Sequence, residues 1–246
     1  MEKRTILIAN DDGIGAEGIA RLAAAALPFG RVFVAAPDNQ CSGMSQKLTI
    51  RGELSVTEAP FPVPVEAAWA VGGTPADCVK AAIKALLPVR PDVVLTGINR
   101  GYNAGFDIAY SGTVGAALEA VMNGVPALAF SARENGNPSA AEAYLPVVLE
   151  ALLARPAEPG RVWNVNFPDC AAAQCKGVLY GRTPAACSFY DNDYVRTGDA
   201  LSIRVTNPGP DRCKEGSDIH AVLHGYVSVG AIRSPLFKLT GGINYV

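Results

Sequence analysis

The feature that most constrains the fold of this chain is an alternation of short apolar runs with segments of helical periodicity in its first half. The apolar runs lie at 5–9, 32–36, 48–50, 69–71, 92–95 and 126–130. Helical spacing of apolar residues occurs at 16–27, 75–87 and 112–122, and Pro75 suits the first position of a helix. Strand–helix–strand alternation predicts an α/β fold, with a mainly parallel sheet between two layers of helices.

In the second half, the strand–helix alternation ends after a predicted helix at 139–153 and a strand at 162–167. Short strand-like pieces at 177–180, 200–205 and 226–229 are separated by Gly, Pro and Asp or Asn, which indicates antiparallel β structure attached to the core. We expect one structural domain, because 246 residues fit a single hydrophobic core. Residues 1–135 would form the α/β core, and 136–246 would complete it and add a β-rich extension that could pack on a partner subunit.

Charge and hydropathy exclude several classes of protein. The 21 Lys and Arg nearly balance the 23 Asp and Glu, so the chain lacks the basic surplus of a protein that binds nucleic-acid polymers. No apolar run reaches the roughly 18 residues that a membrane span requires, and the first residues are not typical of a secretory signal. The six cysteines form no Cys-x-x-Cys pair, which favours reduced thiols and a cytoplasmic location.

The polar residues that follow the predicted strands point to a metal site. The first strand leads into Asn10-Asp11-Asp12-Gly13, the second into 37–45, and the strand at 92–95 into a Gly-rich segment at 96–105. Ligands of an open parallel sheet bind beyond these strand ends. Adjacent carboxylates repel each other unless a cation neutralises them, and Mg²⁺ or Mn²⁺ prefers oxygen ligands. Asp11 and Asp12, with an Asn and a Ser from neighbouring loops, would make such a site; the alternative is one capping and one solvated aspartate.

The start of the predicted helix at 112–122 is a candidate phosphate site. Ser111, Gly112 and Thr113 offer hydroxyls, backbone N–H groups and the positive end of a helix dipole. The alternative is an ordinary Ser or Thr N-cap. The segment 97–105 packs three glycines among amide side chains, which suggests a backbone that approaches a ligand closely.

Two further motifs have weaker claims to chemistry. Residues 13–18 match the dinucleotide-binding pattern Gly-x-Gly-x-x-Gly, and Asp38 follows about 20 residues later. However, Asp11 and Asp12 stand where a pyrophosphate would bind, so we interpret the motif as a strand–turn–helix unit without that function. His220 and His224 have a helical i, i+4 spacing, but the Glu of a His-Glu-x-x-His zinc site is absent, which favours ordinary histidines.

With these residues in view, the chain resembles the SurE-type survival proteins, a family of metal-dependent 5′/3′-nucleotidases. The resemblance rests on segments 8–14, 36–43, 73–79, 97–103 and 111–119, and more weakly on 164–168 and 217–228. It covers almost the whole chain, in the order and spacing of the family. The resemblance implies a Rossmann-like core and hydrolysis of nucleoside 5′- and 3′-monophosphates with one divalent ion per subunit, Mg²⁺ or Mn²⁺. Short polyphosphate is a further candidate substrate.

The resemblance also implies roles for individual residues. The metal ligands would be Asp11, Asp12, Ser42 and Asn99, and we expect Asp11, Asp12 and Asn99 to be catalytic. The residues around the phosphate would be Asn10, Asn103, Ser111, Gly112 and Thr113. The family forms dimers or tetramers with exchanged C-terminal arms, so a homo-oligomer is expected here.

The chain departs from the family pattern after Ser42-Gly43, where Met44, Gln46 and Lys47 replace small polar residues. Two alternatives to a hydrolase remain at this stage. One is a nucleotide- or dinucleotide-binding module built on 13–18, and the other is a scaffold whose loops bind a partner protein.

Overall fold

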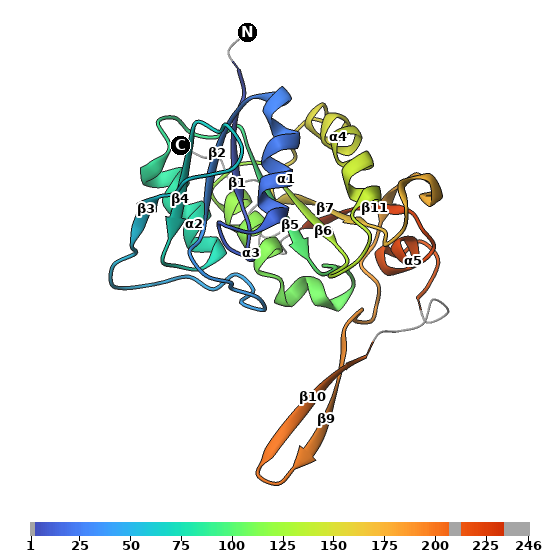
Figure 1. The fold of residues 1–246 in the computed structure, drawn as a ribbon. Helices are drawn as coiled ribbons and strands as arrows, with labels where there is room; N and C mark the ends of the chain where they lie inside the picture. The colour runs from blue at the N-terminus through green and yellow to red at the C-terminus, as the bar shows by residue number, and fades with distance from the viewer. Residues whose placement is uncertain (1–2, 207–212, 234–246) are drawn as a thin grey trace.

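A single mixed sheet organises the molecule, which is described by a computed structural model over residues 3–206 and 213–233. The sheet has nine strands in the order β3-β4-β2-β1-β5-β6-β7-β11-β8 (Figure 1). In chain order its strands are β1 (Thr5–Ala9), β2 (Arg31–Pro37), β3 (Val56–Glu58), β4 (Ala67–Val71), β5 (Val93–Arg100), β6 (Ala127–Ala132), β7 (Arg161–Phe167), β8 (Val178–Arg182) and β11 (Val227–Arg233).

The central strands are parallel and wind outward in two directions from β1. The chain passes from β1 to β2 and β4 on one side, and then from β5 to β6 and β7 on the other, with every neighbouring pair among them parallel. The strand order therefore reverses between β1 and β5. In sheets of this kind the ligand crevice lies at such a reversal, beyond the carboxyl ends of the strands.

Helices cover both faces of the sheet, which confirms the predicted three layers. Ile6 and Ile8 of β1 pack with residues of α1 (Glu17–Ala26) and α4 (Ser139–Leu153). The alternate residues Leu7 and Ala9 face α2 (Pro75–Ala81) and α3 (Gly112–Met122). Because successive side chains of a strand point to opposite faces, an entirely apolar strand such as β1 is buried on both sides.

The helices begin where the sequence supplies caps. Thr74 and Asp77 form a capping box at the start of α2, and Pro75 occupies its first turn. The predicted helices at 112–122 and 139–153 have these bounds in the structure. The predicted helix at 75–87 is instead split into α2 and a π-helical turn at Ala82–Leu86.

Three local expectations differ from the structure. The apolar run at 48–50 is not a strand, because Thr49 donates its backbone N–H and its hydroxyl to the carboxylate of Asp77, at 2.9 and 2.8 Å. The edge strand is β3, whose three residues are all exposed. The sequence patterns also missed the short helix α5 (Asp218–Leu223) and the strand β9 (Asp191–Thr197).

The second half extends the same sheet and adds a separate hairpin. Strand β11 is antiparallel to β7 and parallel to β8. Strands β9 and β10 (Ala200–Thr206) form a two-stranded antiparallel ribbon that extends away from the body (Figure 1). Every residue of the two strands is exposed. In the described residues, no helix is long and apolar enough to cross a membrane.

Candidate active site

A cavity of about 730 Å³ opens beyond the carboxyl ends of β1 and β5, at the reversal of strand order. We call it the first cavity. Asp11, Ser42, Asn99, Asn103 and Ser111 all line it, so the structure brings together five of the predicted site residues from separate loops. Residues at the root of the β9–β10 hairpin supply another wall of the first cavity.

Asp11 is the most enclosed of these residues, with 3% of its surface exposed. One carboxylate oxygen accepts a short hydrogen bond from the hydroxyl of Thr113. A Cβ at Gly112 would lie 2.9 Å from the Cβ of Asp11, so only glycine fits there without displacing the aspartate. Burial raises the pKa of Asp11 to about 6; the Thr113 hydrogen bond opposes this rise, and the neighbouring Asp12 adds to it.

Asp12 lines a second cavity, described below. Its carboxylate accepts a hydrogen bond from the backbone N–H of Arg100 at 3.0 Å. Burial raises its pKa, although the contact with Arg100 works against the rise. The adjacent acids therefore line two neighbouring cavities at the β1–β5 edge.

Asn99 lines both cavities and so adjoins both acids' sites. Its side-chain NH₂ donates to the carbonyl of Gly101 at 2.9 Å. Within residues 3–206 and 213–233, no hydrogen bond reaches its side-chain carbonyl oxygen, which is therefore available to a ligand. Ser42 is exposed on the facing loop, where its hydroxyl accepts from the side chain of Gln40 at 3.1 Å.

The donor set of this edge fits a hard divalent cation. It combines two carboxylates, one hydroxyl and one amide oxygen, which are the ligands that Mg²⁺ and Mn²⁺ prefer. A cation would also relieve the burial of Asp11 beside a second acid. Sites rich in His or Cys are a poorer alternative, because the described part of the chain holds no cluster of three or more His, Cys, Asp or Glu suited to a metal.

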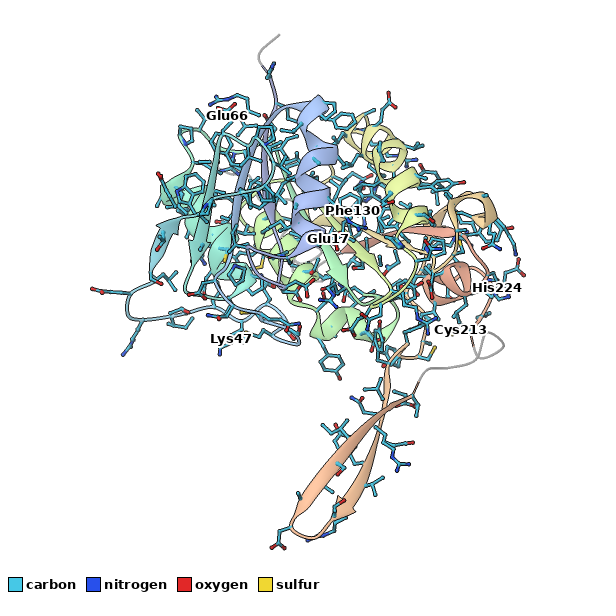
Figure 2. All side chains as sticks on the ribbon, viewed as in Figure 1. Glu17, Lys47, Glu66, Phe130, Cys213 and His224 are labelled. Atoms are coloured by element: carbon cyan, nitrogen blue, oxygen red, sulfur yellow. The ribbon has the colours of Figure 1, made fainter. Side chains whose placement is uncertain are left out.

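The two histidines contact each other rather than a site. Their rings stack with centroids 4.0 Å apart, and Nδ1 of His224 lies 2.8 Å from the carbonyl oxygen of His220. Figure 2 shows His224 beside α5, toward the outer edge of the molecule. Lys47 is exposed on the loop after β2 and lines neither cavity (Figure 2).

The predicted phosphate residues divide into two groups. Ser111 and Asn103 line the first cavity. The hydroxyl of Ser111 accepts the N–H of Val114 at 3.0 Å, so it is an N-cap as well as a cavity residue. The other group, Asn10, Gly112 and Thr113, lies behind the wall of the cavity.

The residues behind the wall fix its shape. Asn10 is fully buried and exchanges two hydrogen bonds with the backbone of Gly13, at 2.9 and 3.2 Å, which holds the turn after β1. Thr113 is also fully buried, and its hydroxyl is occupied by Asp11. In the structure these two side chains support Asp11 and the loop that carries it.

Comparison with known proteins shows the family and supports the fold. The family model described as "Survival protein SurE" matches residues 6–188. The chain belongs to the SurE family. It is 40% identical over 238 residues to the "5′-nucleotidase SurE" of Geobacter sulfurreducens, an alignment that covers 94% of this chain and 88% of that protein. The crystal structure of the SurE protein from Aquifex aeolicus superposes with a TM-score of 0.81 and 34% identity, and 98% of each chain is covered.

This SurE-family site also contains residues that the sequence reasoning missed. The backbone of Asn103 is held by three hydrogen bonds of 2.8–3.0 Å with the side chains of Asn164 and Asn166 on β7. The side chain of Asn103 donates to Ser131 at 2.8 Å. Two asparagines two positions apart in a mostly apolar strand share one face, and that spacing was the signal available in the sequence.

The root of the hairpin is tied to the site by Asp107. Its carboxylate accepts the backbone N–H groups of Phe189 and Tyr190, at 2.7 and 3.1 Å. Tyr190 in turn accepts the backbone N–H of Tyr102 at 3.0 Å and lines the first cavity. No sequence pattern brings residues 80 positions apart together, so only the fold placed this wall.

Proposed function

We propose that this chain is a metal-dependent phosphomonoesterase that releases phosphate from nucleoside 5′- and 3′-monophosphates. The observation that carries the proposal is the placement of Asp11, Ser42 and Asn99 around one cavity with the N-terminus of α3. Membership of a family that includes a protein named 5′-nucleotidase supports the choice of substrate. Short polyphosphate is a second candidate substrate with the same chemistry.

Asp11, Asp12, Ser42 and Asn99 would hold one divalent ion per subunit, Mg²⁺ or Mn²⁺. When bound, such an ion supplies positive charge to the phosphoryl oxygens and lowers the pKa of water. The protein itself positions the substrate. The hydroxyl of Ser111 lines the first cavity and would donate to a phosphoryl oxygen at the N-terminus of α3, where the helix dipole favours an anion. The buried Asn103 network keeps that wall rigid.

Phosphate release from a panel of nucleotide monophosphates, with Mg²⁺, Mn²⁺ or EDTA, tests the proposal. We expect metal-dependent turnover that Asp11→Asn abolishes without loss of the fold, whereas the exposed Glu53→Gln leaves turnover unchanged. Full activity of Asp11→Asn with Mn²⁺ would contradict the assignment. Tight NAD(H) binding without metal, measured by titration calorimetry, would favour a non-hydrolytic binding module instead.

We also propose that the chain works in the cytoplasm as a homodimer or homotetramer. The six free cysteines support a reducing compartment. The projecting hairpin supports assembly, because Leu201, Ile203 and Val205 are each at least 60% exposed and lie on one side of β10. A second copy of this chain is the partner that we propose for this apolar stripe.

A further inference from the structure

A second cavity, of about 630 Å³, lies on the other side of Asn99 from the first. The two cavities share Gln40, Asn99 and Arg100, so a molecule of nucleotide size could reach both. The second cavity is bounded by the turn between β1 and α1, by the end of β2 and by the loop between β6 and α4. Its volume lies within the range of about 300–1,000 Å³ that is usual for small-molecule sites.

The Gly-x-Gly-x-x-Gly motif at 13–18 forms one wall of this second cavity. Gly13 has φ +99°, which permits the tight turn after β1. Gly18 lets α1 pack closely on β5, since a Cβ there would lie 2.1 Å from the carbonyl oxygen of Ile98. Gly15 meets no atom within 4 Å of a built Cβ, so its backbone faces the open cavity. These are the three roles that glycines have in nucleotide-binding βαβ units.

Asp38 completes the resemblance to a nucleoside site. It follows β2 directly, it is exposed, and it lines the second cavity together with the glycines. In nucleotide-binding sheets, a carboxylate at the end of the second strand accepts hydrogen bonds from ribose hydroxyls. The side chain of Asn39 donates to one carboxylate oxygen of Asp38 at 2.8 Å.

The charges around the second cavity favour a neutral group over a second phosphate. Asp12, Glu17 and Asp38 line it and would repel an anion. Two of the three arginines in the lining are already paired with acids: Arg21 with Glu17 and Glu142, at 2.6 and 3.0 Å, and Arg133 with Asp169 at 3.3 Å. The third, Arg100, also lines the first cavity. Ile98 and Ala141 add apolar surface against which a base could pack.

We propose that the second cavity binds the nucleoside of the substrate, with the ribose hydroxyls at Asp38, while the phosphate occupies the first cavity beside Asn99. The motif at 13–18 thus keeps the shape of a nucleotide-binding turn but holds the uncharged half of the molecule. This inference rests on the proposed function, because it assigns the substrate of that reaction to two adjoining cavities.

Filling the second cavity tests the inference. Gly15 does not have a positive φ, so Gly15→Leu adds a side chain to the cavity without backbone strain. We compare kcat/KM for adenosine 5′-monophosphate with kcat/KM for phenyl phosphate, which lacks a nucleoside. The ratio should fall at least tenfold in Gly15→Leu, through a higher KM for the nucleotide. Glu53→Gln, at an exposed site away from both cavities, should keep the wild-type ratio.

A second variant covers the case in which Gly15→Leu does not fold. Asp38→Asn should lower the same ratio for the ribonucleotide and lower it less for a nucleotide without the 2′-hydroxyl. Adenosine alone should inhibit phenyl phosphate hydrolysis by the wild type, and about tenfold more weakly after either substitution.

The outcomes separate the two proposals. A wild-type protein that hydrolyses neither compound would contradict the proposed function. A wild type that hydrolyses both, with ratios unaltered by Gly15→Leu and Asp38→Asn, would overturn the nucleoside subsite and place the nucleoside against the hairpin wall of the first cavity.

Discussion

At the scale of single residues, the adjacent acids Asp11 and Asp12 differ more than their sequence suggests. Asp11 is almost fully buried against Thr113 and Gly112, whereas Asp12 is half-buried and bound by the backbone of Arg100. Asn99 is what joins the two sides, since it lines both cavities.

Asp77 provides a residue-scale prediction about pH. Burial alone would raise its pKa, but hydrogen bonds from Thr74 and Thr49 outweigh burial and hold the pKa below the ordinary value for Asp. A carboxylate with a lowered folded pKa stabilises the protein above its unfolded pKa of about 3.9, and this contribution is lost as the pH falls through the folded pKa. Asp77→Asn should therefore cost roughly 1–2 kcal/mol at pH 7.

The measurement is the free energy of unfolding in urea, for wild type and Asp77→Asn, between pH 7 and pH 3. The difference between the two proteins should shrink on acidification, while Glu53→Gln should follow the wild type throughout. A difference that stays constant with pH would show that the Asp77 charge does not stabilise the fold.

At the scale of elements, the β9–β10 hairpin is the part that the body of the molecule does not stabilise. A lone two-stranded ribbon is marginally stable in water, and this one exposes its apolar side chains. Its root is fixed by Asp107 and Tyr190, so the ribbon starts from a rigid wall of the first cavity. Packing against a second copy would bury the apolar stripe on β10.

The hairpin gives an element-scale prediction. The double change of Leu201 and Ile203 to Ser should shift the protein toward the monomer, because it removes the apolar stripe that a partner would cover. Sedimentation analysis over a range of protein concentrations measures the shift. The change Ser202→Thr, on the opposite side of β10, is the matched control and should leave the assembly as in the wild type. A wild type that is monomeric at every concentration would contradict the proposed assembly.

At the scale of the whole molecule, metal binding should be visible as stability. A ligand that binds only the folded state adds about 2.7 kcal/mol at 100 times its Kd, which raises Tm by roughly 5–10 °C for a chain of this size. We expect Mn²⁺ or Mg²⁺ to raise the Tm and EDTA to reverse the rise. Asp12→Asn should reduce the shift, since it removes one of the two carboxylates. If neither metal moves the Tm of the wild type, the metal site is wrong and a scaffold role gains support.

Much of the fold could be predicted because its signals are local. Local patterns predicted the apolar strands at 5–9 and 92–95 and the helix at 112–122. Their alternation along the chain predicted a parallel sheet between two layers of helices. The hairpin strand β9 could not be found, since none of its residues is buried and its sequence carries no alternation. The run at 48–50 misled for a different reason: its hydrogen bonds go to Asp77, distant in sequence.

The sequence by itself determined which residue types gather at the strand ends, because the order of strands fixes which loops share an edge of the sheet. For this reason it identified Asp11 and Asp12, with an Asn and a Ser from neighbouring loops, as candidate ligands, and the family resemblance specified Ser42 and Asn99. Only the tertiary structure decided which side each residue faces. It placed Asp11 and Asp12 in different cavities, gave Asn10 and Thr113 supporting contacts, and opened the Gly15 turn onto a cavity. Side-chain direction and cavity shape depend on contacts between distant segments, and no local pattern records those contacts.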